Sequence, residues 1–289
     1  MLKSRKDILI KSIGAALLSG ALLCALPGCK DSSNANAAAD SQQNVSEPLV
    51  MNAVELTPDS TPMAGPLANP FWASTRWYTL NSASAGQDPA AVTRAAVAYD
   101  QSNLYIAYIC TGTPPRFDPT AAPMNLWRHD CVEIWLDTSR EQNGTNFFEI
   151  VVAPNGRTNA VWHSSATPPQ PDPNGNLDLN HPYSVIPWKT TGLKTTAATG
   201  LWQGQSAWTL VVQIPLNSMP KPLQSIPAVG DRFRINLLRY QWMPGDAGQP
   251  DELTQYNLFP VPSEAQAVTP YLMGRLVLGS SDEGNLAIK

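Results

Sequence analysis

The sequence predicts an all-β fold, an antiparallel β-sandwich. Short runs rich in Val, Ile, Tyr and Trp recur along the chain, and these residue types favour pleated strands. Pro, Gly, Asn and Asp bound the runs, as is typical of turns between strands. Helical periodicity is nearly absent. A chain made of successive strands buries its apolar faces by packing one sheet on another.

Seven runs are predicted as strands, and one short segment as a helical turn. The turn "QSN" separates the first two runs, and "PLNSM" at 215–219 is the helical turn. In chain order, the predicted strands cover residues 91–100, 104–110, 131–137, 146–153, 207–215, 233–242 and 274–279.

Alternation along three of these runs separates a core face from an outer face, because successive strand side chains point to opposite sides. The all-apolar sets are assigned to the core: Val132, Ile134 and Leu136; Phe148, Ile150 and Val152; Phe233, Ile235 and Leu237. Glu133, Glu149 and Asn236 then fall on outer faces. If their strands share one sheet, these three polar residues share a surface.

The N-terminus predicts export. Basic residues precede an apolar run from about Ile13 to Leu26, which is the pattern of a secretory signal and too short to span a bilayer. The run ends in "LPGC", which resembles a bacterial lipoprotein signal with Cys29 acylated. An ordinary cleaved signal peptide is the alternative. Acylation would anchor the protein in the cell envelope, and we expect the outer membrane.

A polar stretch follows Cys29 and cannot bury a core, so it is interpreted as a flexible tether reaching on the order of 25 Å. The predicted organisation places a signal peptide at 1–28, the tether at 29–50, the sandwich at 51–280 and a tail at 281–289. The net charge of −4 gives no reason to expect nucleic acid.

Six segments resemble family-9 carbohydrate-binding modules. The central one is "WRHDCVEIWLD", which matches the family pattern W-x-x-D-x-V-E-I-x-L-D. The others follow in the family's order, and the likeness runs from about residue 60 to 280: "VAYDQSNLYIAYI" (97–109), "FFEIVVAPNG" (147–156), "WTLVVQIPL" (208–216), "VGDRFRINLLR" (229–239) and "PYLMGRLVL" (270–278).

The resemblance implies a non-catalytic β-sandwich that binds oligosaccharide or polysaccharide, held near the membrane for glycan-degrading enzymes. It implies that Trp127 stacks on a sugar ring, that Glu133 accepts hydrogen bonds from sugar hydroxyls and that Asn236 supplies an amide. Such groups suit a pyranose, which has an apolar face and a rim of hydroxyls. Three further residues complete the expected sugar-binding set: Tyr108, Arg128 and Glu149.

Other positions depart from the family pattern. The second stacking tryptophan falls near Ala267, and an expected aspartate falls at Gly112. Tyr240, Trp242 or Tyr271 would have to supply a replacement aromatic. An adaptor domain that has lost sugar binding is therefore an alternative function.

Catalysis is not expected, because motifs such as G-x-S-x-G and H-E-x-x-H are missing from the sequence. Related DOMON-like sandwiches bind haem through Met and His, but Met124 and His129 lie on one segment, which is poor geometry for opposite haem faces. His129, His163 and His181 are interpreted as solvated loop residues, and Trp135 as packing. Asp130 and Asp137 are expected to cap turns or to hold a structural calcium ion.

The family order also makes the strands 104–110 and 131–137 neighbours. An antiparallel pairing would place Cys110 opposite Cys131 and Tyr108 opposite Glu133, all on the outer face. We therefore expect a Cys110–Cys131 disulfide, since export leads to an oxidising compartment.

Replacing Cys29 tests the anchor. Cys29→Ser should move the protein from the membrane fraction to the soluble fraction, because the acyl chains that hold it at the bilayer are lost. Cell fractionation followed by immunoblotting measures this, with Cys24→Ser as the matched control. Unchanged fractionation of Cys29→Ser would contradict acylation.

Overall fold

The computed structural model describes residues 50–82, 91–170, 181–189, 191–221, 223–245, 251–259 and 272–279. The described residues all belong to one compact unit, which begins at Leu49. The predicted signal peptide, Cys29 and the tether up to residue 49 lie outside the described residues. Within the described ranges, no helix is long and apolar enough to cross a membrane.

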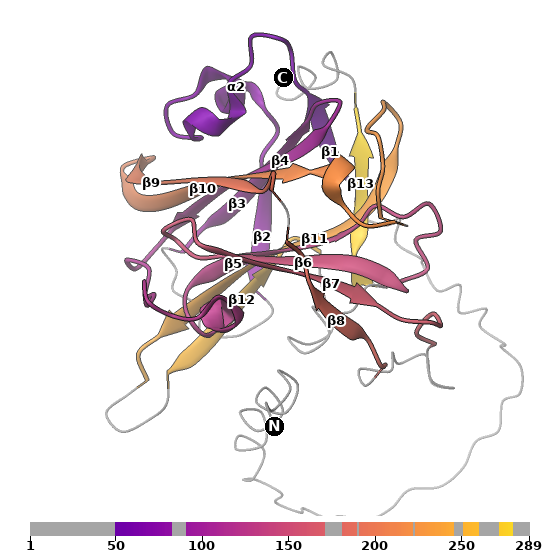
Figure 1. The fold of residues 1–289 in the computed structure, drawn as a ribbon. Helices are drawn as coiled ribbons and strands as arrows, with labels where there is room; N and C mark the ends of the chain where they lie inside the picture. The colour runs from indigo at the N-terminus through magenta and orange to yellow at the C-terminus, as the bar shows by residue number, and fades with distance from the viewer. Residues whose placement is uncertain are drawn as a thin grey trace, which may run out of the picture. The chain divides into compact units, whose positions relative to one another are not determined.

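One layer of this unit contains six strands side by side and a seventh beside them (Figure 1). The order across the layer is β8 (Ser184–Pro187), β7 (Thr158–Ser164), β6 (Asn146–Val152), β5 (Cys131–Asp137), β11 (Arg232–Met243) and β12 (Glu252–Asn257). The seventh strand, β13 (Gly274–Leu278), pairs with the first residues of β11. We call this the first layer.

The second layer lies across the core from it. Its order is β9 (Lys194–Trp202), β10 (Gln205–Pro215), β4 (Asn103–Thr111), β3 (Thr93–Tyr99) and β2 (Tyr78–Ser82). β2 also pairs with β12, and β1 (Val50–Glu55) runs parallel to both β13 and β3. Hydrogen bonding therefore joins the two layers at their edges, and the predicted all-β sandwich is confirmed.

The seven predicted strands and the helical turn η3 (Leu216–Ser218) are present, with ends shifted by at most two residues. Sequence reasoning missed β1, β2, β7, β8, β9 and β12. Several of these are polar or exposed along their length; β8, for example, is exposed at every residue. Their neighbours fix them through backbone pairing, so their side chains carry a weak strand signal.

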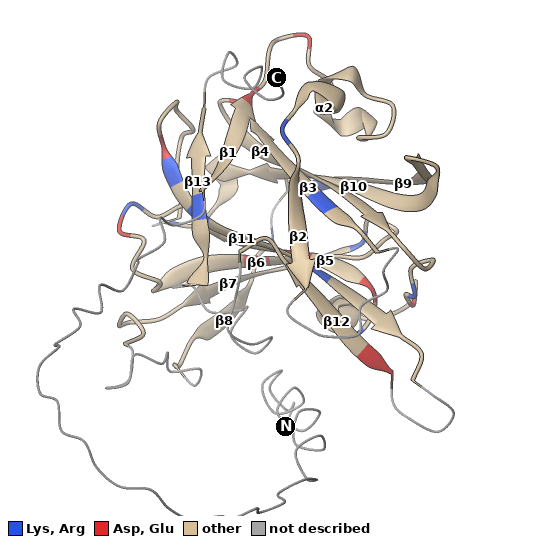
Figure 2. Ribbon diagram, turned by 180° about the vertical axis from the view of Figure 1, so that it is seen from behind, with Lys and Arg blue, Asp and Glu red and all other residues tan. Residues whose placement is uncertain are grey.

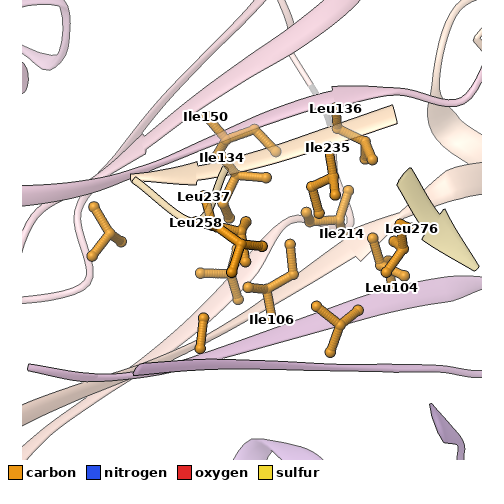
Figure 3. Packing of buried hydrophobic residues seen from close by; sticks show 14 of the residues in the cluster. Leu104, Ile106, Ile134, Leu136, Ile150, Ile214, Ile235, Leu237, Leu258 and Leu276 are labelled. Carbon is orange, nitrogen blue, oxygen red and sulfur yellow. The ribbon is translucent and has the colours of Figure 1, made fainter. Parts of the chain in front are cut away.

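The core lies between the layers and contains the side chains that alternation assigned to it. From the first layer come Ile134, Leu136, Ile150, Ile235 and Leu237; from the second come Leu104, Ile106 and Ile214 (Figure 3). Each is fully buried. Burying one such side chain contributes about 1.5–3 kcal/mol, so this interface stabilises both layers.

A second apolar cluster lies on the far side of the second layer. Trp72 of α2 (Pro70–Ser74) is fully buried there against Ala96, Ala98 and Ala107. Its indole Nε1 donates to the carbonyl of Pro62 in η1 (Pro62–Ala64) at 2.7 Å. The chain between β1 and β2 is thereby fixed over this face (Figure 1).

The expected pairing of 104–110 with 131–137 is wrong. β4 pairs with β3 and β10 in the second layer, whereas β5 pairs with β6 and β11 in the first. The intervening residues 112–130 carry the chain from one layer to the other. Tyr108 faces the core, not the outer surface.

The expected disulfide is also wrong. Cys110 and Cys131 are both buried and both carry thiols. Because their strands belong to different layers, the pairing that would have placed them opposite each other does not form. Burial raises the pKa of the Cys110 thiol to about 12, so it stays protonated at neutral pH.

Polar side chains also cross the core. Arg239 is fully buried, and its Nη1 donates to Thr93 Oγ1 at 3.1 Å and to the carbonyl of Thr111 at 2.9 Å, both in the second layer. Its guanidinium also lies over the rings of Trp208 and Tyr256. Arg239 does not face Glu133, because β11 turns Arg239 to the core while β5 turns Glu133 outward.

Arg239→Ala should lower the free energy of unfolding by about 2–5 kcal/mol, because it leaves a cavity and removes two cross-layer hydrogen bonds. Urea unfolding followed by tryptophan fluorescence measures the loss. Exposed Arg140→Ala is the control and should change stability by less than about 0.5 kcal/mol. Equal unfolding midpoints for the two variants would show that Arg239 does not tie the layers together.

Candidate functional site

Five buried polar side chains gather on the outer face of the first layer. Alternation turns them away from the core, and the strand order β6-β5-β11-β12 brings them together. We call this group the outer polar cluster: Glu133, Glu149, Asn236, Gln255 and Asn257. The prediction that Glu133, Glu149 and Asn236 share a surface is confirmed.

Trp135 lies at the centre of this cluster. The register places it directly opposite Glu149 on β6 and Asn236 on β11. Directly opposite residues on antiparallel strands have their Cβ atoms about 4.5–5.5 Å apart. A carboxylate and an amide therefore flank one indole ring.

An aromatic ladder extends from Trp135 toward the edge of the layer. Trp135 stacks on Phe147 with ring centroids 5.2 Å apart, and Phe147 stacks on His163 at 4.5 Å with the planes 6° apart. Tyr183 meets Phe147 edge-on at 5.1 Å. The ladder crosses β5, β6 and β7 and holds their outer side chains in fixed orientations.

Each carboxylate has a partner on this face. The Trp135 indole donates to Glu133 Oε2 at 3.2 Å, and Glu133 is fully buried. His163 Nε2 lies 2.9 Å from Glu149 Oε2, and the two side chains are 12% and 6% exposed. The interpretation of His163 as a solvated loop residue is wrong. His163 lies on β7, which pairs with β6 and places the ring against Phe147 and Glu149.

A tight turn sets up that contact. Gly156 has φ of 83°, a conformation that favours glycine, and its amide donates to the carbonyl of Ala153 at 2.8 Å. The chain reverses there, so β7 runs back beside β6 and places Val161 opposite Glu149. His163 is two residues further along on the same face.

The amides of the cluster are also held. Gln255 Nε2 donates to Asn257 Oδ1 at 2.8 Å, and the amide of Phe259 donates to Asn236 Oδ1 at 3.4 Å. Sequence reasoning missed Gln255 and Asn257 because β12 carries no apolar run. Leu253, Gln255 and Asn257 are spaced two residues apart and therefore share one face of β12. That spacing has meaning only once β12 is known to be a strand.

Trp127 lies in η2 (Pro123–Arg128), which packs against β6 and β7. It is only 7% exposed, and the exposed Arg128 places its guanidinium 5.3 Å from the Trp127 ring centroid. Trp242 Nε1 donates to the carbonyl of Trp127 at 3.3 Å. The two expected residues Trp127 and Arg128 thus contact each other, and Trp242 brings a second indole next to them.

Arg157, at the β6–β7 turn, secures the loop that carries Trp127. It donates to the carbonyls of Pro119 and Ala121. Asp130 then fixes the end of the loop, because its Oδ1 accepts from the amide of Trp242 at 2.6 Å and its Oδ2 from the amide of Arg116 at 2.9 Å. Burial raises the pKa of Asp130.

Asp137 caps a turn, since its Oδ1 accepts from the amide and the hydroxyl of Ser139. Burial raises its pKa as well. Asp137 thus caps a turn as expected, whereas Asp130 joins the loop to β11 through backbone amides distant in sequence. Among the described residues, no group of three or more His, Cys, Asp or Glu is arranged to hold a metal ion.

Tyr108 does not join the site. Its hydroxyl crosses the core to donate to the backbone carbonyl of Glu133 at 3.1 Å. Tyr240 lies on the outer face of β11, two residues before Trp242. The other replacement aromatic, Tyr271, and the departure at Ala267 lie outside the described residues.

A family model matches residues 65–170, and it describes a carbohydrate family 9 binding domain-like unit. The domain is family-9-like. The matched stretch contains Glu133, Glu149, His163 and the loop with Trp127, whereas β11 and β12 follow it. The family-9-like domain is a binding domain and not an enzyme. None of the curated proteins matches the chain.

Two solved structures share the fold. A family-9 carbohydrate-binding module from Caldicellulosiruptor kristjanssonii, in complex with glucose, is 13% identical, with a TM-score of 0.51 over 80% of this chain and 96% of that one. A candidate carbohydrate-binding protein from Bacteroides uniformis is 13% identical, with a TM-score of 0.53 over 80% of this chain and 99% of the other. At such identities the likeness shows the fold alone.

Separate variants can divide the His163–Glu149 contact into its parts. His163→Gln keeps a donor but loses the stack on Phe147, whereas His163→Phe keeps the stack but loses the donor. A double-mutant cycle of His163→Phe with Glu149→Gln should give a coupling of roughly 1–3 kcal/mol in chemical unfolding, since both side chains are nearly buried. Additive effects of the two changes would mean that the pair contributes no net stability.

Proposed function

We propose that the family-9-like domain binds carbohydrate non-covalently through the outer polar cluster, with Trp127 and Arg128 at the rim. The observation that carries this is the arrangement of Glu149 and Asn236 on either side of Trp135, with Glu133 bonded to the same indole. It occurs in a domain that matches a family of carbohydrate-binding domains.

The chemistry of these groups fits a sugar. A carboxylate accepts hydrogen bonds from hydroxyls, and an amide both donates and accepts, so the two together satisfy a hydroxyl-rich ring. Indole rings pack against the apolar face of a pyranose. A relative with the same fold is bound to glucose, which makes glucose and glucose-containing oligosaccharides the first ligands to test.

Access to the cluster is restricted. Glu133 and Asn236 are fully buried and Trp135 is 3% exposed, so a ligand cannot lie directly on them in the conformation described. His163 and Tyr183, which contact Phe147 of the aromatic ladder, are half-buried and border the cluster at the edge of the layer. The proposal therefore places first contact at the rim and requires the cluster to open when the sugar binds.

The wider role follows from the N-terminus. A lipid on Cys29 would hold the domain at the bacterial cell envelope, where it would keep oligosaccharide or polysaccharide near glycan-degrading enzymes. The support for this is the "LPGC" motif after an apolar run and the polar stretch behind it.

Trp127→Ala should weaken binding by roughly 1–3 kcal/mol, the scale of losing a buried aromatic contact. Glu133→Gln should weaken it less than Glu133→Ala, because the glutamine amide keeps an acceptor. A glycan array with the full-length protein identifies the ligand, and calorimetry then measures each variant. Leu201→Ala, exposed on β9 in the second layer, is the control.

Three results would contradict the proposal. If Trp127→Ala and Glu133→Gln both bind the identified glycan as the parent does, the site is elsewhere. If no glycan binds, the domain is an adaptor. A Soret band in the absorption spectrum would instead support haem binding. Melting temperatures of the same variants separate lost binding from lost folding.

A further inference from the structure

A cavity of about 500 Å³ opens on the other side of the molecule from the outer polar cluster, between the end of β1 and α2. This volume lies within the usual range of small-molecule sites. In Figure 1, α2 lies beyond the second layer, on the side away from β5 to β8. The described lining includes Glu55, Asp59, Asn69, Phe71 and five Ser or Thr residues.

The walls of this cavity are rigidly held. Asn69 donates to the carbonyl of Thr61 at 2.5 Å and accepts from the amide of Phe71 at 3.0 Å, which ties the two sides together. The adjacent Trp72 is buried in the second apolar cluster, so α2 is fixed in place. A site built on anchored elements loses little conformational entropy on binding.

The chemistry of the lining is acidic and hydroxyl-rich. Glu55 is half-buried and Asp59 exposed, and neither forms a hydrogen bond or ion pair with its side chain among the described residues. Five Ser and Thr hydroxyl groups surround them, and none of the described residues that line the cavity is Lys or Arg. Figure 2 shows that acidic and basic residues are sparse over the described ribbon as a whole, so two carboxylates in one cavity are a local feature.

Phe71 is the aromatic residue among the described lining residues. It is half-buried, and its ring forms a T-shaped pair with Trp72, with centroids 5.0 Å apart and an interplanar angle of 71°. As a lining residue it presents apolar surface to the cavity. Apolar faces of sugar rings pack on such surfaces.

We propose that this cavity is a second saccharide-binding site, taking a neutral sugar independently of the outer polar cluster. Glu55 and Asp59 accept hydrogen bonds from sugar hydroxyls, Phe71 packs on the ring, and the Ser and Thr hydroxyls donate or accept around it. Phosphorylated and acidic sugars are disfavoured, because the described lining carries two carboxylates and no Lys or Arg, and like charges repel. Two sites on opposite faces let one domain hold two glycan chains, or two parts of one chain, with a gain in avidity.

Chemical-shift mapping tests this site separately from the first. Full-length, isotope-labelled protein is titrated with a panel of neutral trisaccharides: cellotriose, xylotriose, mannotriose and N-acetylchitotriose. The backbone signals of Glu55, Asp59 and Phe71 should shift along a saturable curve with at least one of them. The same shifts should persist in Trp127→Ala, which alters only the first site.

Changes in the cavity should remove those shifts. Phe71→Leu should weaken this binding by roughly two- to tenfold, the loss of one aromatic contact. Glu55→Gln combined with Asp59→Asn preserves the shape of the cavity and should weaken binding further. An unshifted spectrum at the first site, or an unchanged melting temperature, confirms that these variants are folded.

Two outcomes would overturn the second site. The first is that no member of the panel shifts residues 55–75. The second is that glucosamine binds more tightly than every neutral sugar and Phe71→Leu leaves its affinity unchanged, which would make the cavity a site for cations. Loss of binding at the outer polar cluster alone would sink only the proposed primary function, since the cavity shares no residue with it.

Discussion

The two-residue period of three adjacent strands is the constraint on which the rest of this structure depends. On each of β6, β5 and β11, three residues spaced two apart are aliphatic or aromatic and fill the core between the layers. Burial of that set fixes the register, because a shift by one residue would turn the whole set to the outside. The residues between them must therefore point to the outer face, and this brings Glu149, Glu133 and Asn236 together there.

Polar contacts across the core add specificity to this packing. Arg239 reaches from β11 to Thr93 and Thr111, and Tyr108 reaches from β4 to the backbone of Glu133. These cross-layer hydrogen bonds form only in one relative placement of the two layers. The backbone of β5 beneath the outer polar cluster is thus held from the core side, while the aromatic ladder of Trp135, Phe147 and His163 holds the side chains above it.

Those features also explain why the site looks closed. A cluster of carboxylates and amides surrounded by aromatic rings must satisfy its own hydrogen bonds when no ligand is bound. Glu133 does so with Trp135, and Glu149 with His163. A sugar would therefore exchange these internal contacts for its own, which favours selective over tight binding. The cavity between β1 and α2 differs, because its two carboxylates have no such partners among the described residues.

The sequence by itself determined the seven apolar strands, the sandwich and the faces of β5, β6 and β11, since alternation is a local property of each strand. It did not determine β7 or β12, whose polar sequences become strands only by pairing with β6 and β11. For that reason His163, Gln255 and Asn257 entered the site only with the structure. The sequence also did not determine which layers β4 and β5 belong to, because the loop 112–130 permits either a hairpin or a crossing between layers. Core packing favours the crossing, because the core-facing residues of β4 and β5 bury each other only from opposite layers. As a result, Cys110 and Cys131 lie on strands of different layers, and Tyr108 faces the core.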